Sequence, residues 1–231
     1  MTGAQLTLGV RLRDDARWSN FHGQRNEAPA ALLRTACEGG LYPVIVVCGD
    51  EDTGKSHLLQ AACHDAERDA RSAICMSMAE LLPMGPGVLD SMDEIALVAL
   101  DDVQLVAGLS EWEEALFHLY NRVQDRNHQL IVSLTELPAN IVFVLPDLRS
   151  RLQHGLLVQL GVYRDEDRVT ILQARAEQRG LMLSDEVAGF IMRRASRRLV
   201  DLLGILDTLD ENSLQAQRRL TIPFVKSVMG W

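Results

Sequence analysis

Eight residues in the first quarter of the chain constrain its fold more than any other feature. Gly49-Asp50-Glu51-Asp52-Thr53-Gly54-Lys55-Ser56 fits the pattern G-x-x-x-x-G-K-[ST]. The β-branched run Leu41–Cys48 precedes it and predicts a strand covered on both faces, and we expect a helix from about Lys55. A strand, a glycine-bounded turn and a helix in this order predict a phosphate-binding loop, with an ordinary strand-to-helix turn as the alternative.

The residue types in this loop suit a nucleotide. Glycines let backbone N–H groups face a phosphate, Lys55 can reach the terminal phosphates, and Ser56 can ligate Mg²⁺. The three carboxylates of Asp50, Glu51 and Asp52 predict that phosphate binding is weakened rather than abolished. We predict that the nucleotide is held by Gly49, Asp52, Thr53, Gly54, Lys55, Ser56 and His57, the last through its backbone N–H.

A second group of acids follows about fifty residues later. The apolar run Ile95–Leu100 ends in Asp101 and Asp102. At the carboxyl edge of a parallel sheet, Asp101 would hold Mg²⁺ together with Ser56, and Asp102 could orient an attacking water. Taken alone, a strand that ends in acids is usually a solvated turn. After a phosphate loop, it predicts a magnesium site.

Strand and helix patterns alternate through the first two thirds of the chain. Strands that alternate with helices are joined by right-handed crossovers, and this favours an α/β fold with a parallel five-stranded sheet. Ser110 and Glu113 predict a capping box at the start of one of the helices. We expect an N-terminal arm over 1–17, an α/β base over 18–163 and an α-helical lid over 164–231. The expected strands after the first are Ser72–Ser77, Ile95–Asp101, Gln129–Leu134 and Leu156–Leu160; the expected helices include Ala28–Cys37, Ser110–Asp125, Asp165–Arg179, Ser184–Ala195, Arg197–Gln217 and Ile222–Met229.

Composition excludes several classes of function. The formal net charge of −9 argues against a broad surface for the phosphates of DNA. The four cysteines lack metal spacing and are expected to be reduced core thiols, and the six histidines form no metal or triad pattern. No signal peptide or bilayer-length apolar run is evident, which predicts a soluble cytoplasmic protein without membrane contact.

Longer runs of sequence resemble a known family. Lys55-Ser56-His57-Leu58-Leu59, Asp101-Asp102-Val103 and the run Leu145–Leu152 resemble the AAA+ module of the DnaA family of replication initiators. Leu119–Val123 and Gln217–Lys226 are most similar to its Hda group of short regulators. The resemblance implies an AAA+ P-loop NTPase base with a lid, ADP or ATP with Mg²⁺ as ligands, and DnaA as a partner. Because no basic recognition helix follows the lid, direct sequence-specific DNA binding is not expected.

The resemblance also assigns two roles that concern other proteins. Arg151 corresponds to an arginine finger that acts in trans on a neighbour's nucleotide, the alternative being a surface salt bridge. Gln5, Leu6, Leu8 and Val10 look like a peptide that binds the DNA polymerase sliding clamp (beta subunit), the alternative being a plain edge strand. Assembly with further copies of the same chain stays open.

Two departures from the family pattern concern the chain's own nucleotide. Thr135 stands where DnaA has an acid, and Val200 stands where the lid arginine is expected. Arg197 or Arg198 could replace that arginine only with a shift of helix register. We therefore expect little ATP hydrolysis by the chain itself and a preference for a diphosphate.

These observations lead to one functional hypothesis and two alternatives. The chain is expected to be a regulatory adaptor that stimulates hydrolysis of DnaA-bound ATP and so prevents re-initiation of DNA replication. One alternative is a free-standing ATPase or helicase-loader-like AAA+ protein that uses its own site. The other is a small-molecule kinase, for which the sequence shows no acceptor-binding constellation.

Overall fold

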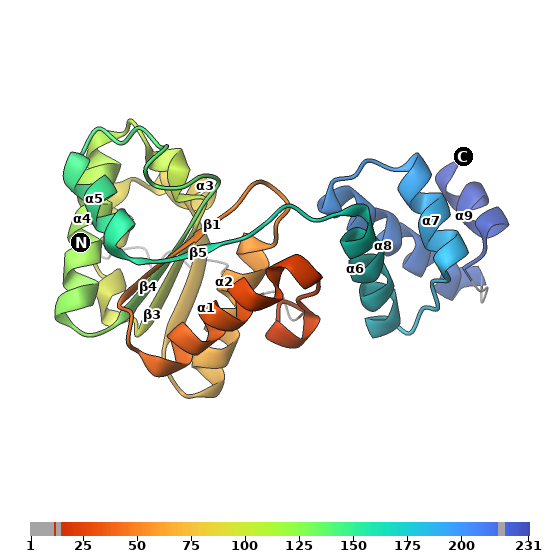
Figure 1. The fold of residues 1–231 in the computed structure, drawn as a ribbon, viewed down its shortest axis with the longest axis horizontal. Helices are drawn as coiled ribbons and strands as arrows, with labels where there is room; N and C mark the ends of the chain where they lie inside the picture. Colours follow the sequence, from red (N-terminus) through yellow and green to blue (C-terminus); the bar gives the residue numbers. More distant parts are fainter. Residues whose placement is uncertain (1–11, 13–14, 217–219) are drawn as a thin grey trace, which may run out of the picture. The chain divides into compact units, whose positions relative to one another are not determined.

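Five strands in the described part of the chain form one parallel sheet (Figure 1). The computed structural model describes residues 12, 15–216 and 220–231, and for residues 214–216 the backbone alone. The strands lie in the order β2-β3-β4-β1-β5, and all the neighbouring pairs are parallel. The predicted α/β class with a parallel five-stranded sheet is confirmed. The strand bounds are β1 Val44–Cys48, β2 Ala73–Ser77, β3 Leu97–Asp101, β4 Gln129–Leu134 and β5 Leu156–Gln159.

The sheet is covered on both faces, as its continuous apolar strands require. Helices α1 (Glu27–Gly39) and α2 (Lys55–Arg68) lie on one side of it, and α4 (Ser110–Asp125) lies on the other (Figure 1). All residues of β1, β3 and β4 are buried. Alternate residues of a strand point to opposite faces. One set, which includes Val46, Val98 and Val132, shares an apolar cluster with α4, while α2 contacts β2, β3 and β4.

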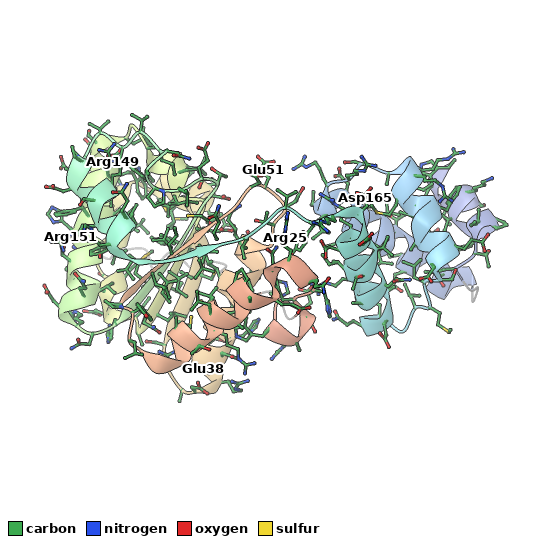
Figure 2. The ribbon with its side chains drawn as sticks, in the orientation of Figure 1. Arg25, Glu38, Glu51, Arg149, Arg151 and Asp165 are labelled. Atoms are coloured by element: carbon green, nitrogen blue, oxygen red, sulfur yellow. The ribbon has the colours of Figure 1, made fainter. Side chains whose placement is uncertain are left out.

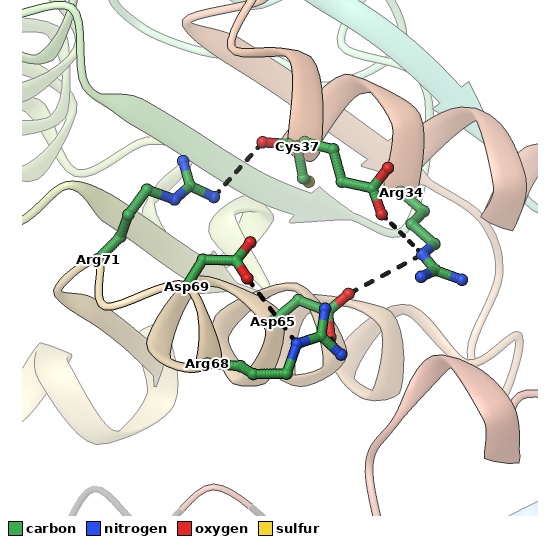
Figure 3. A network of polar contacts seen from close by, with 7 residues as sticks. Arg34, Cys37, Asp65, Arg68, Asp69 and Arg71 are labelled. Carbon is green, nitrogen blue, oxygen red and sulfur yellow. Dashed lines mark hydrogen bonds and ion pairs between the residues drawn. The ribbon is translucent and has the colours of Figure 1, made fainter.

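An ion pair joins α1 to α2, and further polar contacts lie within α2 and between α1 and the residues just after α2 (Figure 3). Arg34 Nε lies 3.9 Å from Asp65 Oδ2, and Arg68 Nη1 lies 3.1 Å from Asp65 Oδ1. Arg71 Nη2 donates a hydrogen bond of 3.4 Å to the carbonyl oxygen of Cys37. Exposed ion pairs of this kind contribute about 0–1 kcal/mol each. The buried apolar faces of the two helices therefore do most to hold them on the sheet.

The four cysteines are free thiols that belong to this core. Cys37, Cys48 and Cys63 are buried, and Cys75 is half-buried. Burial raises the pKa of Cys37 and of Cys48 to about 12. Contact with Cys75, together with burial, also raises the pKa of Cys63. Such thiols are poor nucleophiles, which agrees with the expected structural role.

Two features of the second face differ from the sequence prediction. The capping box is wrong, because α4 begins at Ser110 itself, Leu109 occupies the N-cap position, and no side chain caps the helix. The carboxylate of Glu113 instead accepts a hydrogen bond of 2.7 Å from the backbone N–H of Gly108. The sequence also predicted no helix over α5 (Pro146–His154).

Short helical segments precede α1, and others lie between β2 and β3 and between β3 and α4. Their proline and glycine content prevents longer helices between β2 and β3. The segments are η1 Trp18–Asn20, η2 Gln24–Asn26, α3 Met78–Leu81, η3 Leu82–Met84, η4 Pro86–Leu89, η5 Met92–Glu94 and η6 Val103–Val106.

The described residues fall into two compact units. The first comprises the described residues up to Trp18 with Pro29–Gly49 and Lys55–Gln159, and it contains the sheet. The second comprises Ser19–Ala28, Asp50–Gly54 and Leu160–Trp231. The second unit thus includes the middle of the phosphate loop and a segment that ends in the first two residues of α1.

The second unit is built from helices around an apolar core of its own. Its helices are α6 Asp165–Gln178, α7 Asp185–Arg194, α8 Leu199–Ala216 and α9 Ile222–Met229. The side chain of Ser184 accepts a hydrogen bond from the N–H of Val187 at the start of α7, and Thr221 does the same for Phe224 at the start of α9. Across residues 12, 15–216 and 220–231, none of the helices has the length and apolarity that a bilayer crossing requires.

Candidate functional site: the phosphate loop and the carboxyl edge of the sheet

The loop between β1 and α2 has the backbone that a phosphate loop needs. Asp52 and Gly54 have φ values of 60° and 93°, in the left-handed region that turns successive N–H groups inward. The Thr53 hydroxyl closes the turn by donating to the carbonyl oxygen of Asp50 at 2.8 Å. Asp50 and Glu51 are exposed, and Figure 2 shows Glu51 at the surface. Two of the three loop carboxylates are therefore hydrated rather than turned into the loop.

Gly54 is required by its surroundings as well as by its backbone angle. A Cβ atom at this position would come within 2.7 Å of Phe21 Cε2 and 2.9 Å of the Tyr163 hydroxyl oxygen. Burial raises the pKa of Tyr163 to about 12, and a hydrogen bond with Asn26 partly opposes this. The loop thus rests on two aromatic side chains that sequence reasoning did not single out.

Lys55 and Ser56 stand at the first turn of α2, where the helix N-terminus carries partial positive charge. Lys55 is buried, and its Nζ donates to the carbonyl oxygen of Gly49 at 2.7 Å. His57 turns its ring away, with Nε2 2.8 Å from the carbonyl oxygen of Arg17. The predicted contribution of its backbone N–H requires nothing of that ring.

Asp101 ends β3 directly beside these residues. Its side chain is hydrogen-bonded to the hydroxyl groups of Ser133 on β4 and Ser56 on α2. Burial raises the pKa of Asp101 above its ordinary value, and Asp102 adds to the rise, while the two serines and Lys55 oppose it. The structure therefore brings Lys55, Ser56 and Asp101 together at the carboxyl edge of the sheet.

Asp102 has a different environment from its neighbour. Its φ of 59° is left-handed, and its N–H donates to Ser133 Oγ at 2.9 Å. Its Oδ1 accepts a hydrogen bond of 3.0 Å from the side-chain amide of Gln104. One carboxylate oxygen is thus engaged within the chain, and the predicted role in orienting a water stays a prediction.

This donor set suits a magnesium nucleotide by its chemistry. An ammonium group and inward N–H groups match phosphate oxygens, and a hydroxyl beside a carboxylate matches Mg²⁺, which keeps several waters and takes one or two protein oxygens. Among the described residues, no group of three or more His, Cys, Asp and Glu side chains is arranged to hold a metal ion by itself. The phosphates of a bound nucleotide would supply the remaining oxygens.

Arg198 forms an ion pair with Asp52, and both residues belong to the second unit. Arg198 Nε is 3.7 Å from Asp52 Oδ2, whereas Arg197 pairs with Asp165 at 3.2 Å. The carbonyl oxygen of Arg198 accepts from the first N–H groups of α8, so Arg198 precedes the helix. Val200, by contrast, is 57% exposed.

Arg151 lies on α5, away from the residues above in sequence and exposed to solvent. Its guanidinium carbon is 5.7 Å from the centroid of the Tyr120 ring on α4. The residues proposed for clamp binding, Gln5, Leu6, Leu8 and Val10, lie outside the described residues.

Comparison with known proteins identifies the family. The model for the bacterial DnaA ATPase domain matches residues 88–159, and the model for the Hda lid domain matches residues 165–229. The chain belongs to the DnaA family of AAA+ proteins, with the lid of its Hda branch. A protein of Haemophilus influenzae described as uncharacterized is 39% identical to it, over 98% of each chain.

Solved structures show the same fold. Domain III of the Thermotoga maritima initiator DnaA matches with a TM-score of 0.82 and 22% identity, over 95% of this DnaA-family chain and 98% of its own. AMPPCP-bound DnaA from Aquifex aeolicus matches with a TM-score of 0.73 and 25% identity, over 88% and 68% of the two chains. The T. maritima RuvB branch-migration motor matches with a TM-score of 0.70 and 15% identity, over 95% and 72%. The predicted AAA+ base with a helical lid is confirmed.

Several residues around the site of this DnaA-family chain escaped sequence reasoning. Ser133, the partner of both strand-end aspartates, is an ordinary polar residue within an apolar strand. Phe21 and Tyr163 approach Gly54 from segments distant in sequence, and no periodic pattern marks them. Ser133 could have been found from the sequence, because a hydroxyl in an otherwise apolar strand needs a polar partner.

Proposed function

We propose that this chain is a regulatory adaptor of replication initiation that stimulates hydrolysis of ATP bound to DnaA. Arg151 acts as the finger, entering the nucleotide site of DnaA and stabilising charge that develops on the transferred phosphoryl group. The initiator is thereby returned to its ADP form, which prevents re-initiation. The chain itself is a DnaA-related AAA+ protein, and this family relationship supports DnaA as the partner.

One observation carries the proposal. Arg151 is exposed on α5, and among the residues that the structure describes its guanidinium faces an aromatic ring and pairs with no carboxylate. A guanidinium in a surface salt bridge would have to leave that partner before it could act elsewhere. Over Tyr120, the guanidinium keeps its N–H donors available for phosphate oxygens, which it can bind in a bidentate manner.

The chain's own nucleotide has a structural and regulatory role in this proposal. Gly49, Asp52, Thr53, Gly54, Lys55, Ser56 and His57 bind the phosphates of ADP or ATP, and Ser56 with Asp101 holds Mg²⁺. The AMPPCP complex of the A. aeolicus DnaA supports an adenine nucleotide as the ligand. Thr135 and Val200 remove the family's usual contacts to a third phosphate, so ADP is the favoured ligand and the chain's own turnover is slow.

Clamp binding rests on the sequence alone. Gln5 presents an amide and Leu6, Leu8 and Val10 present apolar groups, which an extended peptide can insert into adjacent polar and apolar pockets. Docking on the DNA-loaded sliding clamp would restrict the activity to the time after replication has begun.

The test is phosphate release from ATP-loaded DnaA in the presence of clamp, DNA and this protein. Replacement of Arg151 by alanine (Arg151→Ala) is expected to lower the stimulated rate about 10³-fold, the lower end of what a supplied arginine contributes. Arg149→Ala is the matched control, since Arg149 is also exposed on α5 (Figure 2), and it is expected to retain the wild-type rate. Equal rates for wild type and Arg151→Ala would exclude the finger.

A free-standing ATPase is the second candidate, and the assembled edge of Lys55, Ser56 and Asp101 favours it. Steady-state ATP turnover by the purified chain alone separates the two. Turnover without DnaA that is lost in Asp102→Asn would support the ATPase. Turnover that appears only with DnaA, and survives Asp102→Asn, would support the adaptor.

A further inference from the structure

Helix α5 is attached to α4 at its beginning by one buried acid. Glu113 of α4 is fully buried, and its carboxylate accepts three backbone hydrogen bonds. The donors are the N–H groups of Gly108 at 2.7 Å, Val144 at 3.1 Å and Leu145 at 2.6 Å. Leu145 is the N-cap residue of α5, and its own side chain provides no cap. The carboxylate therefore fixes the point at which α5 starts.

The same helix contacts α5 again two turns further on. Tyr120 is buried, and its ring lies 5.7 Å from the guanidinium carbon of Arg151. Residues seven apart lie on one face of an α-helix, separated by about two turns, so Glu113 and Tyr120 face α5 together. Glu113 binds the backbone at the start of α5, and Tyr120 contacts the guanidinium of Arg151 on the same helix.

Helix α4, which carries Glu113 and Tyr120, is held firmly in the fold. Trp112, Leu116, Leu119 and Val123 anchor α4 in the main apolar core. At its other end, Arg122 of α4 and Arg126, the residue that follows the helix, pair with the buried carboxylate of Asp93 at 2.9 Å and 2.6 Å. Because α4 is fixed along its length in this way, its contacts fix the position of α5 and of the Arg151 side chain.

We propose that Glu113 and Tyr120 are positioning residues for Arg151. Glu113 sets where α5 begins, and Tyr120 holds the guanidinium over its ring in an extended, solvent-facing arrangement before any partner binds. The inference rests on the proposed function, in which Arg151 acts on DnaA-bound ATP, and it adds the residues that prepare the finger.

The physical reason lies in the freedom of the arginine side chain. A free arginine side chain has considerable rotamer entropy, much of which must be lost when it acts at a fixed point. A side chain already held over an aromatic ring loses less on reaching the transition state. Because a small misplacement of a catalytic group is costly, a shift of the first turn of α5 has a similar effect.

The experiment measures DnaA-bound ATP hydrolysis as a function of adaptor concentration, with clamp and DNA present. Tyr120→Leu is expected to lower the saturating rate about tenfold, because it removes the ring but keeps a buried apolar group. Tyr120→Phe keeps the ring face and is expected to retain the wild-type rate. The adaptor concentration that gives half the saturating rate is expected to stay unchanged in both.

Glu113→Gln tests the other contact. A glutamine retains a single acceptor oxygen and brings an amide donor against backbone N–H groups, so the start of α5 is released and the saturating rate falls about tenfold. Thermal unfolding of each variant shows whether the fold is kept. If Glu113→Gln does not fold, the two Tyr120 variants decide the matter by themselves.

A double variant separates positioning from general destabilisation. In the Arg151→Ala background, Tyr120→Leu is expected to cause no further loss of rate, because the ring acts only through that arginine. A tenfold further loss there, or a wild-type rate for folded Tyr120→Leu, would overturn the positioning role while leaving the finger intact. If Arg151→Ala itself has the wild-type rate, the proposed function fails, and the positioning role fails with it.

Discussion

Two buried aspartates bracket strand β3, and their environments are opposite. Asp93 lies in η5, just before the strand, and Asp101 is its last residue. Burial alone would raise the pKa of Asp93, but the hydrogen bond and charge of Arg122, with the charge of Arg126, hold it below its ordinary value. Among the described residues, Asp101 is opposed by two hydroxyl groups and the ammonium of Lys55, so burial prevails and its pKa is raised.

The difference separates a carboxylate that serves the fold from one that is available for chemistry. At Asp93, two guanidinium groups compensate the charge, and His128 Nδ1 adds a 2.9 Å contact with the backbone carbonyl of the same residue. At Asp101, the charge is left without a full partner in a buried place, which is costly for stability. Groups with such uncompensated charge cluster at functional sites. A divalent cation is the partner that would balance Asp101.

The largest effect on this comparison is expected from Asp93→Ala. Removing the carboxylate leaves Arg122 and Arg126 without their buried partner and releases the segment before β3 from α4, so the free energy of unfolding falls by about 3 kcal/mol. Urea denaturation measures this loss. Glu94→Ala is the matched control, because Glu94 is the exposed neighbour, and its effect should stay within about 0.5 kcal/mol. Similar losses of unfolding free energy for Asp93→Ala and Glu94→Ala would show that Asp93 has no special role in the fold.

Lys55→Ala tests the role of the Asp101 site through nucleotide binding. Loss of the one ammonium beside Asp101 is expected to weaken ADP binding about thirtyfold, or about 2 kcal/mol. Isothermal titration calorimetry with ADP and with ATP measures the change and the expected preference for ADP. Lys226→Ala is the natural control, since Lys226 is the only other lysine in the chain and stands on α9 over the ring of Phe190. Equal affinities for the two variants would show that the loop does not bind phosphate through Lys55.

The smallest effect, and the one with the opposite sign, is expected from Asp101→Asn. Replacing a buried, incompletely balanced charge by an amide should raise stability in the absence of ligand by about 1 kcal/mol at neutral pH. The same change should remove the Mg²⁺ dependence of ADP binding.

The sign with pH follows from the raised pKa. Above that raised pKa, Asp101 is charged in the folded protein and lowers its stability. As the pH falls through the raised pKa towards the ordinary value of an aspartate, the wild type binds a proton and regains stability. The gain from Asp101→Asn therefore shrinks with acidification. Asp93 behaves in the opposite way, and its stabilisation is lost only as the pH falls below the ordinary pKa of an aspartate towards its own lowered pKa. A gain from Asp101→Asn that grows in acid would contradict this assignment.

The sequence predicted the elements that have a long or continuous apolar pattern. The bounds of α4 and β4 agree with prediction because Trp112, Leu116, Leu119 and Val123 form a full stripe and because β4 is apolar almost throughout. Helix α5 was missed, since its buried stripe consists of Leu148 and Leu152 alone. Two positions are too few for a helical period to stand out.

The site was predicted in part, for a related reason. Lys55, Ser56 and Asp101 belong to local motifs, and the structure brings them together. Glu113 was misassigned to a capping box because its partners Val144 and Leu145 are about thirty residues away. A local pattern cannot report a partner that tertiary packing supplies. The finger role of Arg151, the water-orienting role of Asp102 and the clamp motif stay predictions.

The central claim is that the hydrolysed ATP belongs to DnaA and not to this chain. A single-turnover experiment tests it directly, with γ-labelled ATP bound to DnaA, unlabelled ADP bound to this protein, and clamp and DNA present. The account predicts rapid release of the label by the wild type, loss of this release with Arg151→Ala, and no label release when DnaA is replaced by this protein loaded with labelled ATP. Release of label from this protein alone, at a rate that ignores DnaA and Arg151, would contradict it.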